Sequence, residues 1–199
     1  MTEGLGLDDL FKPEDCLCGK CRKQLIELRE RYEVLGMTVE ALYLYTPFFE
    51  NLIYQFKEAK DLPLAPLFLS PYRSALRRQF KNKVIVAVPS SPKRTAQRGY
   101  VPIAELFKSI GIPVLHPFEK DEIKQSQRSA QTRARIAKHI RLANVEAVRG
   151  KSVVIVDDVC TTGHSLHACL ELLKPEAKDV SCWVIALHPA LMRQKRTKR

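Results

Sequence analysis

The 199-residue sequence lacks any apolar run long enough to cross a bilayer. Its first segment, MTEGLGLDDLFKPED, has neither the basic region nor the apolar region of a signal peptide. Internal repeats and low-complexity tracts are also absent, and with 45% hydrophobic and 28% charged residues the chain can bury a core. We therefore expect a soluble cytoplasmic protein that has no membrane partner. Its length suits one domain, or one domain with a small appendage.

The cysteines lack the spacing of a disulfide framework. Three of the six, Cys16, Cys18 and Cys21, crowd near the N-terminus in Cys-Leu-Cys-Gly-Lys-Cys, and the other three are scattered. A structural zinc site commonly uses two CxxC pairs, and here the second pair is missing. Binding of Zn²⁺ by these three thiolates then needs a fourth ligand from a distant histidine or from a second subunit of an oligomer. The alternative is a reduced cysteine cluster without metal.

Acidic residues are scarce in one region of the chain. Residues 73–141 contain 16 Lys and Arg but only 4 Asp and Glu, so this region holds the whole formal net charge of +11. The C-terminal MRQKRTKR is a further basic segment. Such an excess suits a phosphate-bearing partner, either a phosphorylated small molecule or nucleic acid. The alternative is a solvated basic face.

The apolar segments predict an α/β fold with a parallel sheet covered by helices on both faces, because uninterrupted Val and Ile runs alternate with helical segments. We expect a section 1–36 with the cysteine motif and a helix, and a main domain 37–199 that ends in the basic tail. Strands are predicted at 39–45, 84–91, 151–159 and 179–188. Helices are predicted at 24–35, 48–60, 64–80 with a break near Pro71, 95–110 and 164–173.

The segment 153–165, VVIVDDVCTTGHS, is the most informative stretch. An apolar strand delivers Asp157 and Asp158 to its carboxyl end, where open α/β sheets bind ligands. The following loop opens a helix, whose N-terminus attracts phosphate. Hydroxyl donors and a glycine that permits close backbone approach come from Thr161, Thr162, Gly163 and Ser165. Phosphate, sugar hydroxyls and Mg²⁺ held by the two acids together describe a phosphorylated ribose.

The same segment fits an acidic helix cap, a phosphoacceptor site or a P-loop less well. A helix cap or a phosphoacceptor aspartate does not need the Thr-Thr-Gly loop, and the P-loop pattern GxxxxGK[ST] is absent. Cys160 lies inside the loop and is interpreted as a packing residue. We expect His164 and His167 to be exposed or capping residues.

A pyrophosphate needs a second anion site, and two segments can supply it. The first, PSSPKRTAQRGY (89–100), follows a predicted strand, and the second, KQSQRSAQTRAR (124–135), is rich in arginine. Hydroxyls, guanidinium groups and a glycine suit an anion. The candidate residues are Ser90, Ser91, Arg94, Arg98, Gly99, Arg128 and Arg133.

The segment 153–165 resembles the 5-phosphoribosyl-1-pyrophosphate (PRPP) signature of type I phosphoribosyltransferases. The resemblance implies a type I phosphoribosyltransferase-like parallel sheet flanked by helices, behind a small cysteine-containing appendage. It also implies that Asp157 and Asp158 are catalytic, meet the ribose 2′ and 3′ hydroxyls and accompany Mg²⁺. The loop that cradles the 5′-phosphate comprises Thr161, Thr162, Gly163, His164 and Ser165.

Further segments resemble the ComF-like competence proteins. They are the cysteine motif, Lys57 and Asp61, the Arg-x-x-x-Arg-Gly-Tyr run at 94–100 and the stretch 125–133. Val101 and Pro102 depart from that family's usual Asn-Gln, which puts in doubt any role of those amides. The resemblance implies an accessory factor in competence and DNA uptake that binds PRPP, a nucleotide or single-stranded DNA, alongside a helicase-like partner.

The alternative function is an active Mg²⁺-dependent phosphoribosyltransferase that transfers ribose 5-phosphate from PRPP to an unknown nitrogen nucleophile. The sequence shows the parts for clamping a pyrophosphate, but no acceptor-base pocket and no general base. It therefore leaves the choice between the two functions open.

Overall fold

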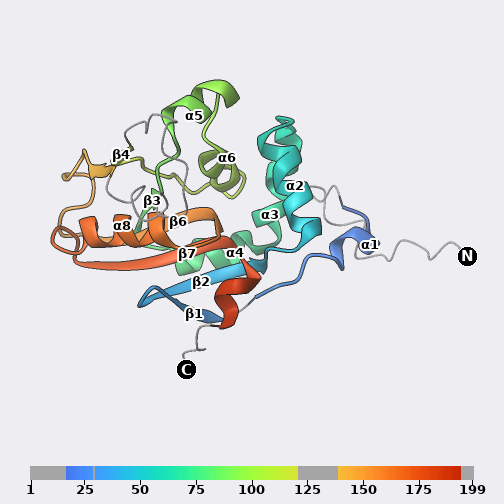
Figure 1. Ribbon diagram of the computed structural model, residues 1–199, viewed down its shortest axis with the longest axis horizontal. Coiled ribbons are helices and arrows are strands. Elements are labelled where there is room, and N and C mark those ends of the chain that lie inside the picture. The colour runs from blue at the N-terminus through green and yellow to red at the C-terminus, as the bar shows by residue number, and fades with distance from the viewer. Residues whose placement is uncertain (1–16, 29, 121–138, 194–199) are drawn as a thin grey trace, which may run out of the picture.

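A five-stranded sheet forms the centre of the protein in the computed structural model, which describes residues 17–28, 30–120 and 139–193 (Figure 1). In spatial order, its strands are β1 (Arg31–Val34), β2 (Met37–Leu44), β7 (Asp179–Leu187), β6 (Ser152–Cys160) and β3 (Val84–Ala87). The last four are parallel to their neighbours, and only β1 pairs antiparallel, with β2. A separate hairpin pairs β4 (Phe118–Lys120) with β5 (Ile140–Leu142). The predicted α/β fold with a largely parallel sheet is confirmed.

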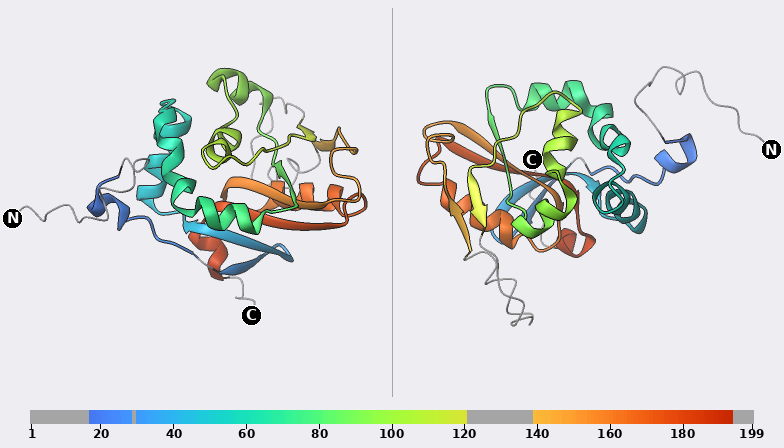
Figure 2. Two further views of the ribbon diagram at one scale, coloured as in Figure 1. Left: turned by 180° about the vertical axis from the view of Figure 1, so that it is seen from behind. Right: turned by 90° about the horizontal axis from the view of Figure 1, so that it is seen from above.

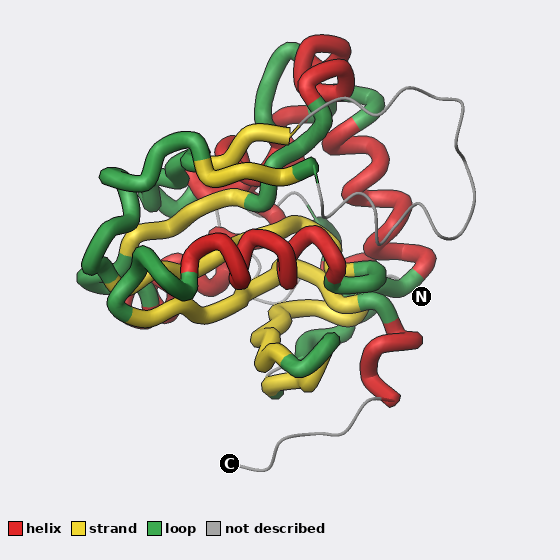
Figure 3. The backbone as a smooth tube through the Cα atoms, turned by 60° about the vertical axis from the view of Figure 1, so that its left-hand side comes forward, coloured by secondary structure: helices red, strands yellow, loops and turns green. Residues whose placement is uncertain are grey.

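Helices cover both faces of this sheet (Figures 1 and 2). One face packs against α2 (Pro47–Lys57), α3 (Ala65–Leu69), α4 (Arg73–Gln79) and α6 (Pro102–Lys108). The other face packs against α8 (His164–Leu173), the β4–β5 hairpin and the 3₁₀ helix η4 (Pro189–Arg193). Figure 3 shows α8 lying along the strands. The remaining helices are α1 (Gly19–Arg22), η2 (Leu62–Leu64), η3 (Ser70–Tyr72) and α5 (Pro92–Arg98).

Strand β6 divides its side chains between the two apolar cores. Val154 and Val156 pack in the core under α2, α3 and α6, whereas Val153 and Ile155 pack in the core under α8. This is the two-residue alternation of a strand that is buried on both sides. It follows that the next two residues of β6 also start toward opposite faces.

The helix predicted at 24–35 is wrong, because β1 occupies residues 31–34. Tyr32 and Val34 point into the core and alternate with more exposed neighbours, as a strand requires. Leu35 and Gly36 have φ of 52° and 76°, the positive values of a tight turn that joins β1 to β2. The paired strands therefore lie on both sides of the boundary expected at residue 36, and the division into two sections stays a prediction.

The single helix predicted at 95–110 is also wrong. Helix α5 ends at Gly99, which has φ of 82°, and α6 starts anew with Pro102 in its first turn. The left-handed glycine and the proline together break one expected helix into two. The break in the 64–80 segment near Pro71 is confirmed, with η3 between α3 and α4. In the part of the chain that the structure describes, no helix combines the length and apolarity that a membrane crossing needs.

Candidate phosphate and diol site at the end of strand β6

Asp157 and Asp158 lie near the carboxyl end of β6, as the sequence predicts. The backbone N–H of Asp158 donates a hydrogen bond of 2.9 Å to Oδ1 of Asp157. Asp158 lies toward α2, where it pairs with Lys57, whereas Asp157 acts electrostatically on Cys160 and Cys169 of the core under α8. The two carboxylates therefore meet different partners on the two sides of the sheet.

The partner of Asp158 is Lys57, the last residue of α2. The lysine Nζ forms an ion pair with Oδ2 of Asp158, and the side chains are only 17% and 18% exposed. The helix is fixed at its start by Pro47 in the first turn and by Thr46, whose hydroxyl accepts from the backbone N–H of Phe49. Its buried face comprises Phe49, Leu52, Ile53 and Phe56. The packing of α2 thus aims its C-terminal lysine at the end of β6.

The charges of two lysines act on Asp157: Lys57 and Lys120, the latter at the end of β4. Burial and the negative charge of Asp158 together raise the pKa of Asp157 to about 7, while the charges of Lys57 and Lys120 and the backbone hydrogen bond from Asp158 oppose the rise. Burial lowers the pKa of Lys120, and the charge of Asp157 opposes that change. Both lysines thus act on Asp157, and a half-buried carboxyl group with a pKa raised to about 7 lies within the site.

The sequence analysis missed Lys120 altogether. A lone lysine on a three-residue strand carries no motif, and 37 residues separate it from Asp157. Lys57 entered only through the family resemblance. Neither residue could be linked to the acids by spacing, because the fold alone brings α2 and β4 to β6.

The loop after β6 leads into α8 as expected. Thr161 is exposed, Thr162 is half-buried, and Gly163 has φ of 80° where the helix begins. His164 and Ser165 form the first turn of α8 and are half-buried. The unpaired backbone donors of a helix N-terminus thus lie directly beyond the acids, which suits a phosphate.

Cys160 is buried and has a packing role, as predicted. It is 3% exposed, and burial raises the pKa of its thiol to about 12. The thiol is therefore protonated at neutral pH, which disfavours a nucleophilic role.

Gly163 is needed for packing against the β1–β2 hairpin. A Cβ at this position would lie 2.5 Å from Cγ1 of Val34 and 3.2 Å from Cε of Met37. The sequence analysis assigned this glycine to close approach of a phosphate, and its contact with the hairpin is a separate, structural reason for it. Strand β1, which the sequence analysis did not predict, therefore packs against this loop.

The first predicted pyrophosphate segment lies at the start of α5. Ser91 caps this helix, because its Oγ accepts a hydrogen bond of 3.3 Å from the backbone N–H of Arg94. Ser90 and Arg94 are exposed, and the charge of Arg94 acts on both Lys120 and Glu58. Arg94 thus belongs to the same charged cluster as the acids of β6, although Ser91 uses its hydroxyl for the cap.

Arg98 and Tyr100 attach this segment to the end of α2. Arg98 forms an ion pair with Glu58, and this guanidinium lowers the pKa of the Glu58 carboxyl. The Tyr100 hydroxyl donates to the backbone oxygen of Phe56. In this structure Arg98 thus binds a carboxylate rather than standing open to an anion, and the α5–α6 turn holds the C-terminus of α2 in place.

Several predicted residues lie outside the described part of the chain. They are Arg128 and Arg133 of the second arginine segment, and Cys16 of the cysteine motif. Cys18 precedes α1 as its N-cap residue and Cys21 lies within the helix, and hydrogen bonds from Cys21 lower the pKa of Cys18. Among the residues described, no three His, Cys, Asp or Glu side chains gather as a metal site. The zinc site stays a prediction.

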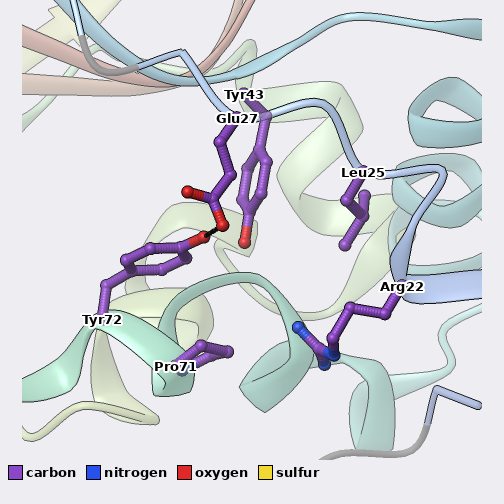
Figure 4. A pocket seen from close by; sticks show the side chains of 6 residues that line it. All are labelled: Arg22, Leu25, Glu27, Tyr43, Pro71 and Tyr72. Carbon is purple, nitrogen blue, oxygen red and sulfur yellow. Dashed lines mark hydrogen bonds between the residues drawn. The ribbon is translucent and has the colours of Figure 1, made fainter. Parts of the chain in front are cut away.

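A cavity of about 210 Å³ lies away from these groups (Figure 4). Arg22 of α1 and Tyr43 of β2 contribute to it, and the Tyr72 hydroxyl donates to the carboxylate of Glu27 across it. Leu25 and Pro71 complete the lining. None of the predicted site residues borders this cavity, so it is separate from the end of β6.

Comparisons with known proteins point to the same region. The model of the phosphoribosyl transferase domain family matches residues 74–198, which include β3, β6, α8 and β7. Competence protein ComFC of Bacillus subtilis is 22% identical over 86% of this chain and 83% of its own length. Competence protein ComFC of Streptococcus pneumoniae is 27% identical over 74% of this chain and 67% of its own length. These findings confirm the family expected from the sequence.

Similar solved structures include a hypoxanthine phosphoribosyltransferase from Staphylococcus aureus. It has a TM-score of 0.43 and 14% identity, over 69% of this chain and 71% of its own. A hypoxanthine phosphoribosyl transferase from Trypanosoma cruzi has a TM-score of 0.38 and 12% identity, over 87% of this chain and 75% of its own. The family match and the observed sheet give the fold class that the sequence predicts.

Proposed function

Because the chain belongs to the phosphoribosyl transferase domain family, we propose that it binds PRPP with Mg²⁺ at the end of β6. One observation carries the proposal: the adjacent acids Asp157 and Asp158 lead through the Thr-Thr-Gly loop into the N-terminus of α8. Carboxylates suit the ribose hydroxyls, and the free amides of a helix N-terminus suit the 5′-phosphate. These two groups lie at opposite ends of one short loop, as a phosphorylated ribose requires.

The pyrophosphate of PRPP finds its cations beside this loop. Arg94 is exposed at the start of α5 and acts electrostatically on Lys120, whose charge in turn acts on Asp157. Ser90 is exposed in the same turn. Arg128 and Arg133 extend this set as proposals from the sequence. Guanidinium and ammonium groups are the usual protein partners of phosphate oxygens.

The donor set fits Mg²⁺. Two carboxylates lie together, and Asp157 has a raised pKa partly because of the charge of Asp158, so a divalent cation would favour ionisation of both. Asp157 and Asp158 would hold the ion together with ligand oxygens. Mg²⁺ there supplies positive charge for the pyrophosphate. Lys57 and Lys120 balance the acids from either face.

Similarity to ComFC supports a role in competence and DNA uptake. A direct contact with single-stranded DNA is favoured by the charge of α4 and the turn that follows it. Arg77, Arg78, Lys81 and Lys83 are exposed, and residues 73–104 contain no Asp or Glu. We propose this face for DNA, and a helicase-like partner in the same process.

Catalysis is a second candidate function, favoured by the pair of acids beside the proposed phosphate loop. In a phosphoribosyl transfer, the bond from ribose C1 to pyrophosphate breaks and pyrophosphate leaves with the electron pair. A bond from C1 to a nitrogen nucleophile forms, and the nitrogen loses a proton. The carboxylate of Asp157 is a candidate acceptor for that proton.

Calorimetric titration of PRPP with Mg²⁺ tests the binding proposal. We expect saturable binding to the wild type and loss of binding in Asp157→Asn/Asp158→Asn. Glu146→Gln/Glu171→Gln makes the same charge change at side chains that are 75% and 50% exposed, and should bind like the wild type. A folded wild type that gives no heat with PRPP would overturn the proposal. Pyrophosphate release with a panel of nitrogen bases then tests catalysis.

Fluorescence anisotropy with a single-stranded oligonucleotide tests the DNA contact. Arg77→Gln/Arg78→Gln should weaken binding and make its salt dependence shallower, because fewer phosphate contacts release fewer counterions. Asp157→Asn should leave DNA affinity unchanged, since α4 is separate from β6. Absence of binding at low salt would contradict a direct contact.

A further inference from the structure

We propose that Lys57 makes the site selective for phosphoribosyl ligands that carry a pyrophosphate over those that do not. The inference rests on the proposed function, because it assigns a specificity-determining residue to the PRPP site. It starts from one contact: the ammonium of Lys57 pairs with the carboxylate of Asp158. This is one of the two acids proposed to hold the ribose and Mg²⁺.

The Lys57–Asp158 pair is largely shielded from water, with side-chain exposures of 17% and 18%. Moving the ammonium off Asp158 without a new partner is therefore costly, because a shielded charge needs compensation. A ligand that engages Asp158 through ribose hydroxyls or Mg²⁺ must displace Lys57. The affinity of that ligand then depends on what it offers the displaced lysine.

Pyrophosphate offers the replacement. Lys57 pairs with Asp158, and its charge acts on Glu58 together with the charges of Arg94 and Arg98 of α5. The pyrophosphate on ribose C1 can accept charge-assisted hydrogen bonds from the displaced ammonium of Lys57. Ribose 5-phosphate has a hydroxyl at C1, so it breaks the ion pair without compensation.

The backbone of Lys57 stays in place during this exchange. The Tyr100 hydroxyl hydrogen-bonds the carbonyl oxygen of Phe56 and, at 3.4 Å, that of Lys57 itself. Phe56 is fully buried in the core. Only the flexible four-carbon stem of the lysine is free to swing, which is the motion that moving Nζ from carboxylate to pyrophosphate needs.

Titration calorimetry with two probes tests the selectivity. Mg²⁺ with PRPP and Mg²⁺ with ribose 5-phosphate are titrated into the wild type and Lys57→Met. We expect Lys57→Met to bind PRPP about tenfold or more weakly, and ribose 5-phosphate as well as the wild type or better. The ratio of the two affinities therefore falls at least about tenfold.

Lys60→Met is the matched control, because Lys60 is exposed three residues beyond Lys57 and carries the same charge. It should leave the ratio of the two affinities unchanged. This control distinguishes a direct contact of Lys57 with the ligand from a long-range effect of positive charge. Lys57→Gln, which can still hydrogen-bond Asp158, replaces Lys57→Met if thermal melting shows that the latter does not fold. It should also lower the ratio.

The outcomes separate this inference from the proposed function. A folded wild type that binds neither probe overturns both. A wild type that binds PRPP, with Lys57→Met weakening both ligands equally or neither, keeps the PRPP site and overturns the role of Lys57. A ratio that falls equally in Lys60→Met also overturns it, because the effect is then general charge.

Discussion

Gly163 rests on Val34: a Cβ on the glycine would lie 2.5 Å from Cγ1 of the valine. The first residue belongs to the loop that precedes α8, and the second to the edge strand β1. The β1–β2 hairpin lies outside the family match at 74–198. Its packing against Gly163 thus helps to position the loop of the proposed phosphate site. The loop and the hairpin should respond to mutation as one unit.

Gly163→Ala should lower the free energy of unfolding by about 3 kcal/mol, from the overlap with Val34 and from a φ of 80° that alanine disfavours. Chemical denaturation measures the change. Gly99→Ala is the matched control, because its φ is 82° but no atom lies within 4 Å of the added Cβ. It should cost only about 1 kcal/mol.

A double-mutant cycle checks the cause of the loss. Val34→Ala opens room for the new methyl group, so Gly163→Ala should cost at least about 1 kcal/mol less in the Val34→Ala background. Purely additive effects would show that the strain at Gly163 lies elsewhere.

Tyr43 holds α3 against the sheet through one buried hydrogen bond. It is 1% exposed, and its hydroxyl donates to the backbone oxygen of Phe68 at 3.2 Å. Tyr43→Phe leaves that oxygen without this donor and should cost about 1–2 kcal/mol of unfolding free energy. Tyr54, at 61% exposure, is the control, and Tyr54→Phe should stay within about 0.5 kcal/mol of the wild type. Equal effects of the two changes would contradict this role of the Tyr43 hydroxyl.

The sequence predicts the strands of the central sheet well where apolar residues run without interruption. Strands β6 and β7 and helix α8 belong to this group, because burial on both faces leaves no competing pattern. Strand β1 fails for a physical reason. Leu28 and Tyr32 are spaced for a helix, whereas Tyr32 and Val34 are spaced for a strand, and only pairing with β2 decides between them.

The sequence also predicts one part of the candidate site and not the other. The acids and the Thr-Thr-Gly loop are contiguous, so their motif predicts their place at the end of β6. Lys57 and Lys120 come from α2 and β4, and the ion pair of Lys57 with Asp158 and the electrostatic effect of Lys120 on Asp157 exist only through the packing of those elements. Gly163 illustrates both levels, since the motif shows the residue and only the structure shows its contact with Val34.

Cys18 should be the most reactive thiol among the described cysteines. Hydrogen bonds from Cys21 lower the pKa of Cys18, whereas burial raises the pKa values of Cys160 and Cys182 to about 12 and also raises that of Cys169. At pH 7 a larger fraction of Cys18 is therefore thiolate. Mass spectrometry after brief alkylation of the chelator-treated protein should find Cys18 modified first. Modification of Cys160 first would contradict the burial of the signature loop.

The same experiment with and without the chelator tests the proposed zinc site. Thiolates that hold Zn²⁺ react slowly until the metal is removed, so a chelator should speed alkylation of Cys16, Cys18 and Cys21. Metal analysis should find zinc in the wild type and not in Cys18→Ser/Cys21→Ser. An alkylation rate that does not change with the chelator, with no zinc in the wild type, would favour a cysteine cluster without metal.

Asp157 should make the protein less stable as the pH rises toward neutrality. Its pKa is about 7 in the folded chain, against an ordinary value of 3.8, because of burial and the charge of Asp158. Between these values the folded state binds more protons than the unfolded state. The free energy of unfolding therefore falls as the pH rises through this window, and the loss is complete above pH 7.

Asp157→Asn removes this titration, so the stability of the variant relative to the wild type should increase with pH. Denaturation at several pH values should show a relative gain of about 1–3 kcal/mol between pH 4 and pH 8. Asp179→Asn changes an exposed carboxyl at the start of β7 and should give a profile parallel to that of the wild type. A parallel profile for Asp157→Asn would mean that Asp157 ionises normally in the folded protein. The lysines on the two faces of β6 would then fully offset burial, and Asp157 would lose its claim to act as a base near pH 7.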